Sequence, residues 1–290
     1  MIADNKTVSL ILSSGGARGL AHIGVIHWLE ENGYAIRSIS ACSIGALIGG
    51  MYAAGKLDVF TGWVRAITKK DILKLLDISF GSSGMVKGEK IIKTLKDLVG
   101  DQLIEDLPIT YTAVASDITN EKEIWLNEGP LFDAIRASIS LPLFFTPTRL
   151  NDVELLDGGI LNPVPIAPTF SDDTDMKIAV NLGGPVDKHI AASSPNQHMQ
   201  AEPDLMDRIS HFIDVIQGER DEPGNGTLGM LDIANQSFDA MQSAIARQKL
   251  AAYPPDEIIE LPRNLCGMLE FDRAEEMIET GYRLAAEKLT

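Results

Sequence analysis

Residues 7–19 read TVSLILSSGGARG, and this stretch decides the fold. Its first half, Thr7–Leu12, is a short apolar run with several β-branched residues, which predicts a buried strand. The second half is too rich in serine and glycine to continue that strand, so it predicts a loop. Leu20–Glu31 then has helical spacing, and Asn32-Gly33 ends that helix as a C-cap. Strand, glycine loop and helix together form the opening of a parallel βαβ unit.

The same order repeats immediately downstream. Ile36–Ala41 predicts a second buried strand. Ile44–Ala54 predicts a helix of small and apolar residues that stops at Gly55. Two strand–turn–helix units in succession favour an α/β fold built on a parallel sheet.

The rest of the chain alternates further helix and strand patterns and offers no convincing linker. Helical patterns cover 58–100 (broken at 80–84), 131–138, 230–250 and 273–288, and strand patterns cover 109–116, 123–126, 153–156, 177–182 and 258–261. Residues 187–229 are rich in Pro, Gly, Ser and charge, which predicts a long surface excursion. One helical face inside it favours docking on the core over a role as a lid; it carries Leu205, Ile209, Phe212, Ile213 and Ile216. We expect a single domain over 1–290.

Composition excludes several classes of protein. Of the 290 residues, 45% are apolar, which is too many for intrinsic disorder. The net charge of −16 disfavours a nucleic-acid binder, because such a surface repels phosphate. Cys42 and Cys266 cannot make a disulfide scaffold, so a reducing compartment is expected. The sequence has neither an apolar run of about 18 residues nor a signal peptide, and we expect a cytoplasmic protein.

Positive charge is concentrated in one part of this acidic chain. Residues 1–100 carry 12 basic and 8 acidic side chains, whereas the remainder carries 13 and 33. The excess lies between Lys56 and Lys96, with Phe60, Trp63 and Met85 interleaved. Two interpretations stay open: solvated helix faces, which we favour, or a surface for transient contact with an anionic membrane.

Ser43 is the first residue that points to chemistry. It lies in Ala41-Cys42-Ser43-Ile44-Gly45, between a predicted strand and a predicted helix. This is close to the G-x-S-x-G elbow, in which a tight turn exposes a serine oxygen at a helix N-terminus. A helix N-cap serine is the alternative, but the strand before it and the helix after it favour a nucleophile.

The glycine loop that follows the first strand can collect backbone amides around one point. Consecutive N–H groups in such a loop bind phosphate or a developing oxyanion. The spacing of Gly15, Gly16 and Gly19 does not match the G-x-G-x-x-G of dinucleotide folds, and a Walker G-K-[ST] is missing. An oxyanion hole beside Ser43 agrees better with the sequence. Arg18 would either hold the shape of this loop or meet an anionic head group.

Asp157, in Leu156-Asp157-Gly158-Gly159 at a predicted strand end, is the candidate base. A carboxylate there can accept a serine proton, although an Asx turn is the alternative. None of the five histidines has the loop setting of a catalytic base: His22, His27, His189, His198 and His211. No cluster has the spacing of metal ligands either.

Taken together, these segments resemble the patatin-like phospholipase family, in the bacterial branch related to neuropathy target esterase. The family pattern is G-G-G-x-[RK]-G, then G-x-S-x-G, then D-G-[GA]. The corresponding segments 14–19, 41–45 and 157–159 occur here in that order, the first two with one replacement each. Two further blocks look like the family, namely Arg136–Pro142 with Phe145 and Pro147, and Asn162-Pro163-Val164-Pro165. Weaker similarity continues to Phe271–Ala274 and Gly281-Tyr282.

The resemblance implies a three-layer α/β/α sandwich with a mostly parallel sheet, core motifs within 7–184 and a helical extension over 200–290. It implies Ser43 as nucleophile and Asp157 as base of a Ser–Asp dyad. Gly15, Gly16, Arg18 and Gly19 would form the oxyanion-hole loop, with no cofactor. Two residues depart from the pattern. Ser14 replaces the first loop glycine and Ala41 the first elbow glycine; at positive φ, Ser14 would strain the loop.

Three functions follow from this similarity. The first is a serine esterase acting on lipid acyl chains, of lysophospholipase or phospholipase A type. The second is an acyltransferase that uses the same acyl-serine. The third is a lipid-binding regulatory protein of weak activity, which only the two glycine replacements favour. Chain length, head group and oligomeric state are not predicted.

Overall fold

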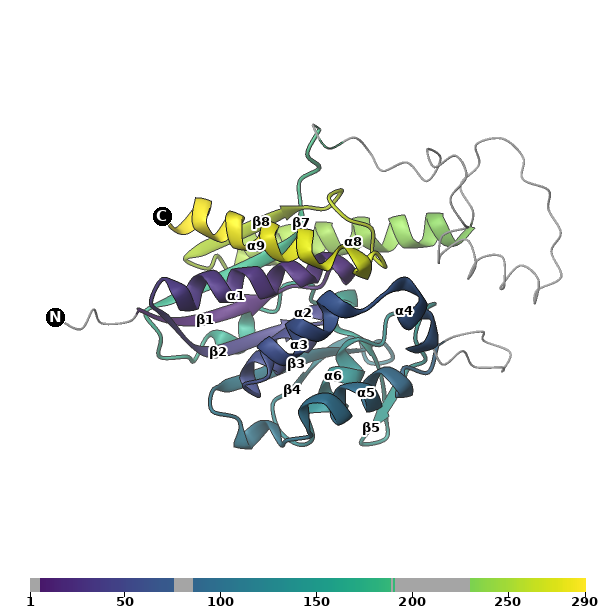
Figure 1. Ribbon diagram of the computed structural model, residues 1–290. Coiled ribbons are helices and arrows are strands. Elements are labelled where there is room, and N and C mark those ends of the chain that lie inside the picture. Colours follow the sequence, from purple (N-terminus) through teal and green to yellow (C-terminus); the bar gives the residue numbers. More distant parts are fainter. Residues whose placement is uncertain (1–5, 76–85, 189, 191–229) are drawn as a thin grey trace, which may run out of the picture.

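The computed structural model describes residues 6–75, 86–188, 190 and 230–290 (Figure 1). Its centre is one sheet in the order β5-β6-β3-β2-β1-β7-β8, with β4 paired to β3 beside this path. The strands are β1 (Lys6–Leu12), β2 (Tyr34–Cys42), β3 (Thr110–Asp117), β4 (Lys122–Leu126), β5 (Thr148–Leu150), β6 (Val153–Asp157), β7 (Met176–Gly184) and β8 (Glu257–Pro262).

Parallel pairing dominates the sheet. The pairs β1–β2, β1–β7, β2–β3 and β7–β8 are all parallel. The antiparallel strands β4, β5 and β6 gather at the β3 end. The mostly parallel α/β sheet expected from the sequence is therefore confirmed.

Helices cover both faces of the sheet. The main core lies between one face and a layer of helices that includes α1 (Ala21–Glu31), α2 (Ile44–Ala53) and α9 (Ala274–Leu289). The other face packs against α8 (Met230–Ala252). Strand β1 contributes side chains to both layers, because successive side chains of a strand point to opposite faces. Leu10 and Leu12 pack in the main core, and Ile11 packs in the layer under α8. This is the expected three-layer sandwich.

The C-terminal part of the chain is more than a helical extension. Its strand β8 pairs with β7 and completes the sheet. Its helix α9 lies beside α1 (Figure 1). The two helices cross at glycines: a Cβ on Gly24 would lie 1.9 Å from the carbonyl oxygen of Ile278, and one on Gly281 would lie 1.9 Å from that of Ala21. The N- and C-terminal segments therefore share one core.

The region between β2 and β3 is helical, as predicted. It contains α3 (Leu57–Ala66), α4 (Lys69–Leu75) and α5 (Glu89–Val99). The break predicted at 80–84 and the stripe over 205–216 lie outside the described residues. Helix α6 (Leu131–Ser138) has the predicted bounds. Strand β5 was not predicted, because three residues give no periodic pattern.

Part of the positive charge between Lys56 and Lys96 is neutralised. Lys96 makes ion pairs with Asp101 at 2.7 Å and Asp133 at 3.6 Å. Arg65 pairs with Glu275 at 2.6 Å. The side chains of the lysines at 87, 90 and 93 are exposed to solvent. Among the described helices, none is long and apolar enough to cross a membrane.

Candidate active site

Ser43 occupies a strained turn between β2 and α2. Its backbone has φ 54° and ψ −129°, a region that residues other than glycine rarely adopt. The side chain makes no capping hydrogen bond to α2, which argues against the N-cap interpretation. The turn is tight: a Cβ on Gly45 would lie 2.5 Å from the carbonyl oxygen of Leu12. Ala41 is fully buried in the strand before the turn, where its methyl group is accommodated.

Sheet register explains why Asp157 meets Ser43. Strand β4 covers one edge of β3, so β2 and β6 share the other edge. On that edge β2 ends with Cys42 opposite Val114, and β6 follows with Asp157 opposite Ala115. The residue that leaves β2 and the last residue of β6 are thus neighbours, although 114 positions separate them. The Ser43 hydroxyl donates a 2.6 Å hydrogen bond to Oδ2 of Asp157.

Asp157 is fully buried, and its carboxylate accepts two hydrogen bonds. Its Oδ1 accepts the amide N–H of Gly159 at 2.7 Å, and its Oδ2 accepts the Ser43 hydroxyl. Burial raises the pKa of Asp157 from 3.8 to about 7, because the charged form loses its hydration; the two hydrogen bonds oppose this shift. A carboxylate with a pKa near neutrality suits proton transfer to and from a hydroxyl.

Ser138, at the end of α6, holds the backbone of the elbow. Its Oγ accepts the amide N–H of Ser43 at 2.9 Å and donates to the carbonyl of Val114 at 2.6 Å. The side chain is fully buried. We did not predict this residue as part of the site. The only signal was its place in the Arg136–Pro142 block.

The glycine loop lies against Ser43. Its residue Gly16 and Ser43 both line a hydrophobic cavity. Gly16 has φ 58°, and a Cβ there would lie 2.4 Å from the carbonyl oxygen of Met268. The flanking amides are already hydrogen-bonded. The N–H of Ser14 donates to the carbonyl of Pro163 at 2.9 Å, and the N–H of Ala17 donates to the carbonyl of Met268 at 2.8 Å. Within the described part of the chain, the amides of Gly15 and Gly16 have no such acceptor.

The other two loop glycines permit close packing. A Cβ on Gly15 would lie 2.6 Å from the side chain of Leu182 on β7. One on Gly19 would lie 2.3 Å from the side chain of Ile44 on α2. These contacts press the loop against the sheet and against the helix that follows Ser43.

Arg18 points away from the cavity and shapes the loop. It is only 4% exposed. Its Nε donates to the carbonyl of Gly15 at 3.2 Å, its Nη1 donates to the carbonyl of Arg263, and its Nη2 pairs with Asp239 on α8 at 2.7 Å. Of the two roles left open for Arg18, these contacts favour holding the loop.

Ser14 is accommodated without backbone strain. It is not among the residues with positive φ, so the replacement of glycine costs little. Its hydroxyl donates to Oε1 of Gln242 on α8 at 3.1 Å. The same glutamine lies against Gly159, where a Cβ would approach its Nε2 to 2.3 Å. Helix α8 thus contacts both the glycine loop and the turn after Asp157, contacts that no local pattern predicted.

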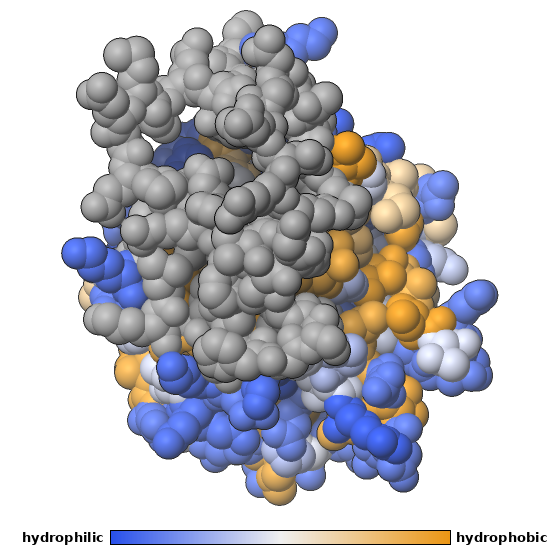
Figure 2. Space-filling model, turned by 90° about the vertical axis from the view of Figure 1, so that its right-hand side faces the viewer, coloured by the Kyte–Doolittle hydropathy of each residue, from blue (hydrophilic) through white to orange (hydrophobic). Residues whose placement is uncertain are grey.

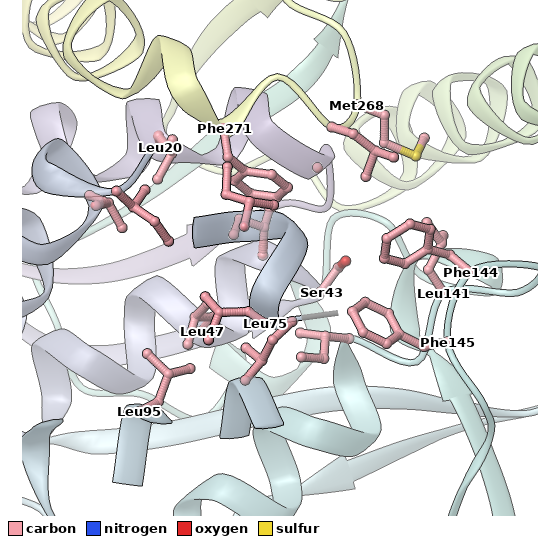
Figure 3. Close-up of a pocket in the computed structure, with 18 of the residues that line it drawn as sticks. Leu20, Ser43, Leu47, Leu75, Leu95, Leu141, Phe144, Phe145, Met268 and Phe271 are labelled. Atoms are coloured by element: carbon pink, nitrogen blue, oxygen red, sulfur yellow. The ribbon is translucent and has the colours of Figure 1, made fainter. Parts of the chain in front are cut away.

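A hydrophobic cavity opens beside Ser43 (Figure 3). The cavity is partly open to solvent. In the space-filling view, hydrophobic surface is visible at this end of the molecule, beside the grey atoms (Figure 2). Of the residues that the structure describes, twenty line the cavity, and Ser43 carries the only hydroxyl among these twenty. Sequence patterns did not reveal this cavity, because its walls come from separate segments: 16–20, 43–47, 60–75, 91–95, 139–145 and 268–271.

The two histidines on α1 are structural. His22 is fully buried and hydrogen-bonds the carbonyl of Ser13 at 3.0 Å, and burial lowers its pKa to about 4. His27 lies 3.6 Å from Asp58. The remaining histidines, 189, 198 and 211, fall outside the described residues. Across the ranges that the structure describes, no group of three or more His, Cys, Asp or Glu could hold a metal ion.

Several known proteins are similar to this chain. Residues 10–170 match the family model described as patatin-like phospholipase. An uncharacterised NTE family protein of Mycobacterium bovis is 39% identical over 99% of this chain and 92% of its own length. Lysophospholipase NTE1 of Pyricularia oryzae is 27% identical over 98% of this chain and 18% of its own length. Neuropathy target esterase sws of Drosophila melanogaster is 33% identical over 61% of this chain and 13% of its own length.

The family model covers more than half of the chain, so this protein belongs to the patatin-like phospholipase family. Its relatives carry the NTE name, as the resemblance to the branch related to neuropathy target esterase implied. The chain is accordingly a hydrolase of carboxylic esters.

Proposed function

We propose that this protein is a serine esterase that cleaves the acyl ester of a lipid, of lysophospholipase or phospholipase A type, through an acyl-serine on Ser43. The observation that carries the proposal is the 2.6 Å hydrogen bond from the Ser43 hydroxyl to Asp157. It gives a nucleophile and a base within direct reach, beside a cavity suited to apolar chains.

The first half-reaction transfers the acyl group to the enzyme. Asp157 takes the proton of Ser43 as the serine oxygen attacks the ester carbonyl carbon. The oxyanion then accepts hydrogen bonds from the free amides of Gly15 and Gly16. When the tetrahedral intermediate collapses, the bond to the alcohol oxygen breaks and Asp157 returns its proton to the leaving alcohol. Ser43 is left acylated.

The second half-reaction releases the acid. A water molecule takes the place of the alcohol and gives its proton to Asp157 as it attacks the acyl carbon. The second tetrahedral intermediate collapses, the bond to Ser43 Oγ breaks, and the proton returns to the serine. If a second alcohol or a lysolipid replaces water, the same acyl-serine gives transfer, and product analysis with an added acceptor distinguishes the two outcomes.

Substrate class follows from the cavity and from the relatives. An apolar cavity with one hydroxyl favours a hydrocarbon chain, since burial of apolar surface provides the binding energy. The relative in Pyricularia oryzae is named a lysophospholipase, which agrees with a lipid ester.

Contact with an anionic membrane surface and a cytoplasmic location also remain proposals. The exposed lysines at 87, 90 and 93 on and near α5 support the first. Binding of the full chain to vesicles with and without phosphatidylserine is the test. The charge reversals Lys90→Glu and Lys93→Glu together are expected to weaken binding to the anionic vesicles, and unchanged binding would exclude the contact at this site.

The esterase proposal is tested with p-nitrophenyl esters and a fluorophosphonate probe. Wild type is expected to hydrolyse the esters and to be labelled at Ser43. Ser43→Ala and Asp157→Asn are expected to lose at least about 10³-fold in kcat. Ser40→Ala is the matched control, because Ser40 is a buried serine of the same strand whose hydroxyl bonds the carbonyl of Pro165. Full activity in Ser43→Ala would refute the proposal.

A further inference from the structure

The cavity beside Ser43 has a defined direction. Figure 3 places Ser43 between Phe144 and Phe145 on one side and Leu47 and Leu95 on the other. The two phenylalanines are partly exposed, and Leu143 next to them is 60% exposed. Leu95, in contrast, is fully buried. Among the described lining residues, the side chains at the phenylalanines are therefore partly exposed, whereas Leu95 closes the cavity at α5.

The floor is closed by packed side chains from several helices. Leu95 and Phe60 are 0% and 2% exposed, and Val64 is 6% exposed. All three line the cavity and belong to the main core, so they cannot move aside without disturbing it. A chain that enters from Ser43 meets this wall.

Helix α5 presents one face to the cavity. Ile91 and Leu95 are four residues apart, so they lie one above the other on the same side of the helix, and both line the cavity. Ile91 is half-buried and Leu95 is fully buried. The opposite side of α5 carries the exposed residues Lys90, Lys93 and Asp97. The cavity is thus bounded by a helix whose other face carries exposed charged side chains.

We infer that Leu95, with Phe60 and Val64 beside it, limits the length of the acyl chain that the enzyme accepts. The inference rests on the proposed function and adds the kind of substrate: an ester with an unbranched acyl chain that extends from the Ser43 carbonyl to α5. Short acyl groups leave the floor unoccupied. Chains longer than the cavity have to leave methylenes in water or displace Leu95.

The test is a comparison of acyl-chain lengths. For the wild-type full chain, kcat/KM on p-nitrophenyl esters from 2 to 16 carbons is expected to rise up to about fourfold per methylene and then level off or fall. In Leu95→Phe the optimum is expected to move to shorter chains. The rate on the 2-carbon ester is expected to change less than about threefold, and the rate on the ester that wild type prefers to fall at least tenfold.

Leu98→Phe is the matched control. It makes the same substitution three residues along the same helix, at a partly buried leucine that is not a lining residue of the cavity. Its chain-length profile is expected to match wild type. If Leu95→Phe does not fold, judged by its thermal melting curve, Ile91→Phe gives the same test at a less buried position. A profile in Leu95→Phe or Ile91→Phe with the wild-type optimum would overturn the inference.

A binding measurement separates this inference from the proposed function. Ser43→Ala is titrated calorimetrically with saturated fatty acids of 6 to 14 carbons below their micelle concentrations. If wild type hydrolyses none of the esters, affinity of Ser43→Ala that still rises with chain length to a limit would retain the length limit set by Leu95 and reject the esterase. Hydrolysis that depends on Ser43 but not on chain length would do the reverse.

Discussion

The amide N–H of Ser43 donates a 2.9 Å hydrogen bond to the hydroxyl of Ser138, which in turn donates to the carbonyl of Val114 at 2.6 Å. One buried hydroxyl thus connects the end of α6, the β3 strand and the strained backbone of the elbow. A residue at φ 54° needs surrounding contacts to keep it there, and this bond is one of them.

Ser138→Ala is therefore expected to lower kcat by about 10- to 100-fold with little change in KM, because the nucleophile loses its fixed position. An unsatisfied buried amide also destabilises the fold by about 1–3 kcal/mol. Steady-state kinetics and thermal melting measure both effects. Thr169→Ala removes another fully buried hydroxyl, bonded to the carbonyl of Ile166, and is expected to affect stability only. An unchanged kcat in Ser138→Ala would contradict the positioning role.

The pH dependence of the reaction is expected to follow Asp157. The reactive form is the carboxylate, and burial raises the pKa of Asp157 to about 7. Below that pH, kcat/KM should fall about tenfold per pH unit, since only the ionised fraction can accept the serine proton. The rate of fluorophosphonate labelling at Ser43, measured from pH 5 to 9, should show the same limb. A limb near pH 4, the range of an ordinary carboxyl group, would contradict this assignment.

The same pKa predicts a gain of stability when Asp157 is replaced. Between about pH 4 and pH 7 the unfolded chain has already released the Asp157 proton that the folded chain retains, so folding loses stability as the pH rises. Asp157→Asn cannot ionise. Its melting temperature should exceed that of wild type by more at pH 8 than at pH 4.5.

Asp175 is a comparison residue, because its pKa is shifted in the opposite direction to that of Asp157. Hydrogen bonds from the backbone and hydroxyl of Thr7 lower the pKa of Asp175, so its charged form stabilises the fold. Asp175→Asn should lower the melting temperature at both pH values. Equal gains for Asp157→Asn at pH 4.5 and pH 8 would argue against a raised pKa at the site.

Substitutions at two glycines of positive φ distinguish a role of Gly16 in the active site from a general effect of backbone strain. Gly16→Ala forces alanine to φ 58° and brings its Cβ to 2.4 Å from the Met268 carbonyl oxygen. We expect kcat to fall by about 10²-fold or more, because the amides around the oxyanion shift. Gly55→Ala imposes a similar φ of 66° where nothing lies within 4 Å, and should cost about 1 kcal/mol of stability without a change in kcat. Equal effects on kcat would contradict a role for Gly16 at the site.

Sequence patterns predicted best what lies close together along the chain. The Ser43 turn follows from a predicted strand over 36–41, a predicted helix over 44–54 and the pentapeptide 41–45 that joins them. The strand before Gly15 is recognisable from six residues. That Ser43 and Asp157 meet depends on where β2 ends along β3, which residue types alone do not specify. The expectation came from the family resemblance, and the register of β3 gives its physical cause.

Contacts made by distant elements were the part that could not be predicted. Ser138 reaches Ser43 only because α6 ends against β3, and Gln242 reaches Ser14 only because α8 docks on the second face of the sheet. The cavity is a further example, since six separated segments build its wall. A short strand such as β5 leaves no periodic signal. In each case the contact depends on tertiary packing, which alternating or helical sequence patterns do not specify.

The glycine crossing of α1 and α9 has a practical consequence for dividing this protein. A version truncated after β7 would contain the glycine loop, the serine elbow and the Asp157 segment. It would nevertheless expose the face of α1 around Gly24 and leave an unpaired edge on β7. Such a fragment is expected to aggregate. Boundaries drawn around motifs alone would therefore give insoluble pieces, and libraries for directed evolution should retain the whole chain through Leu289.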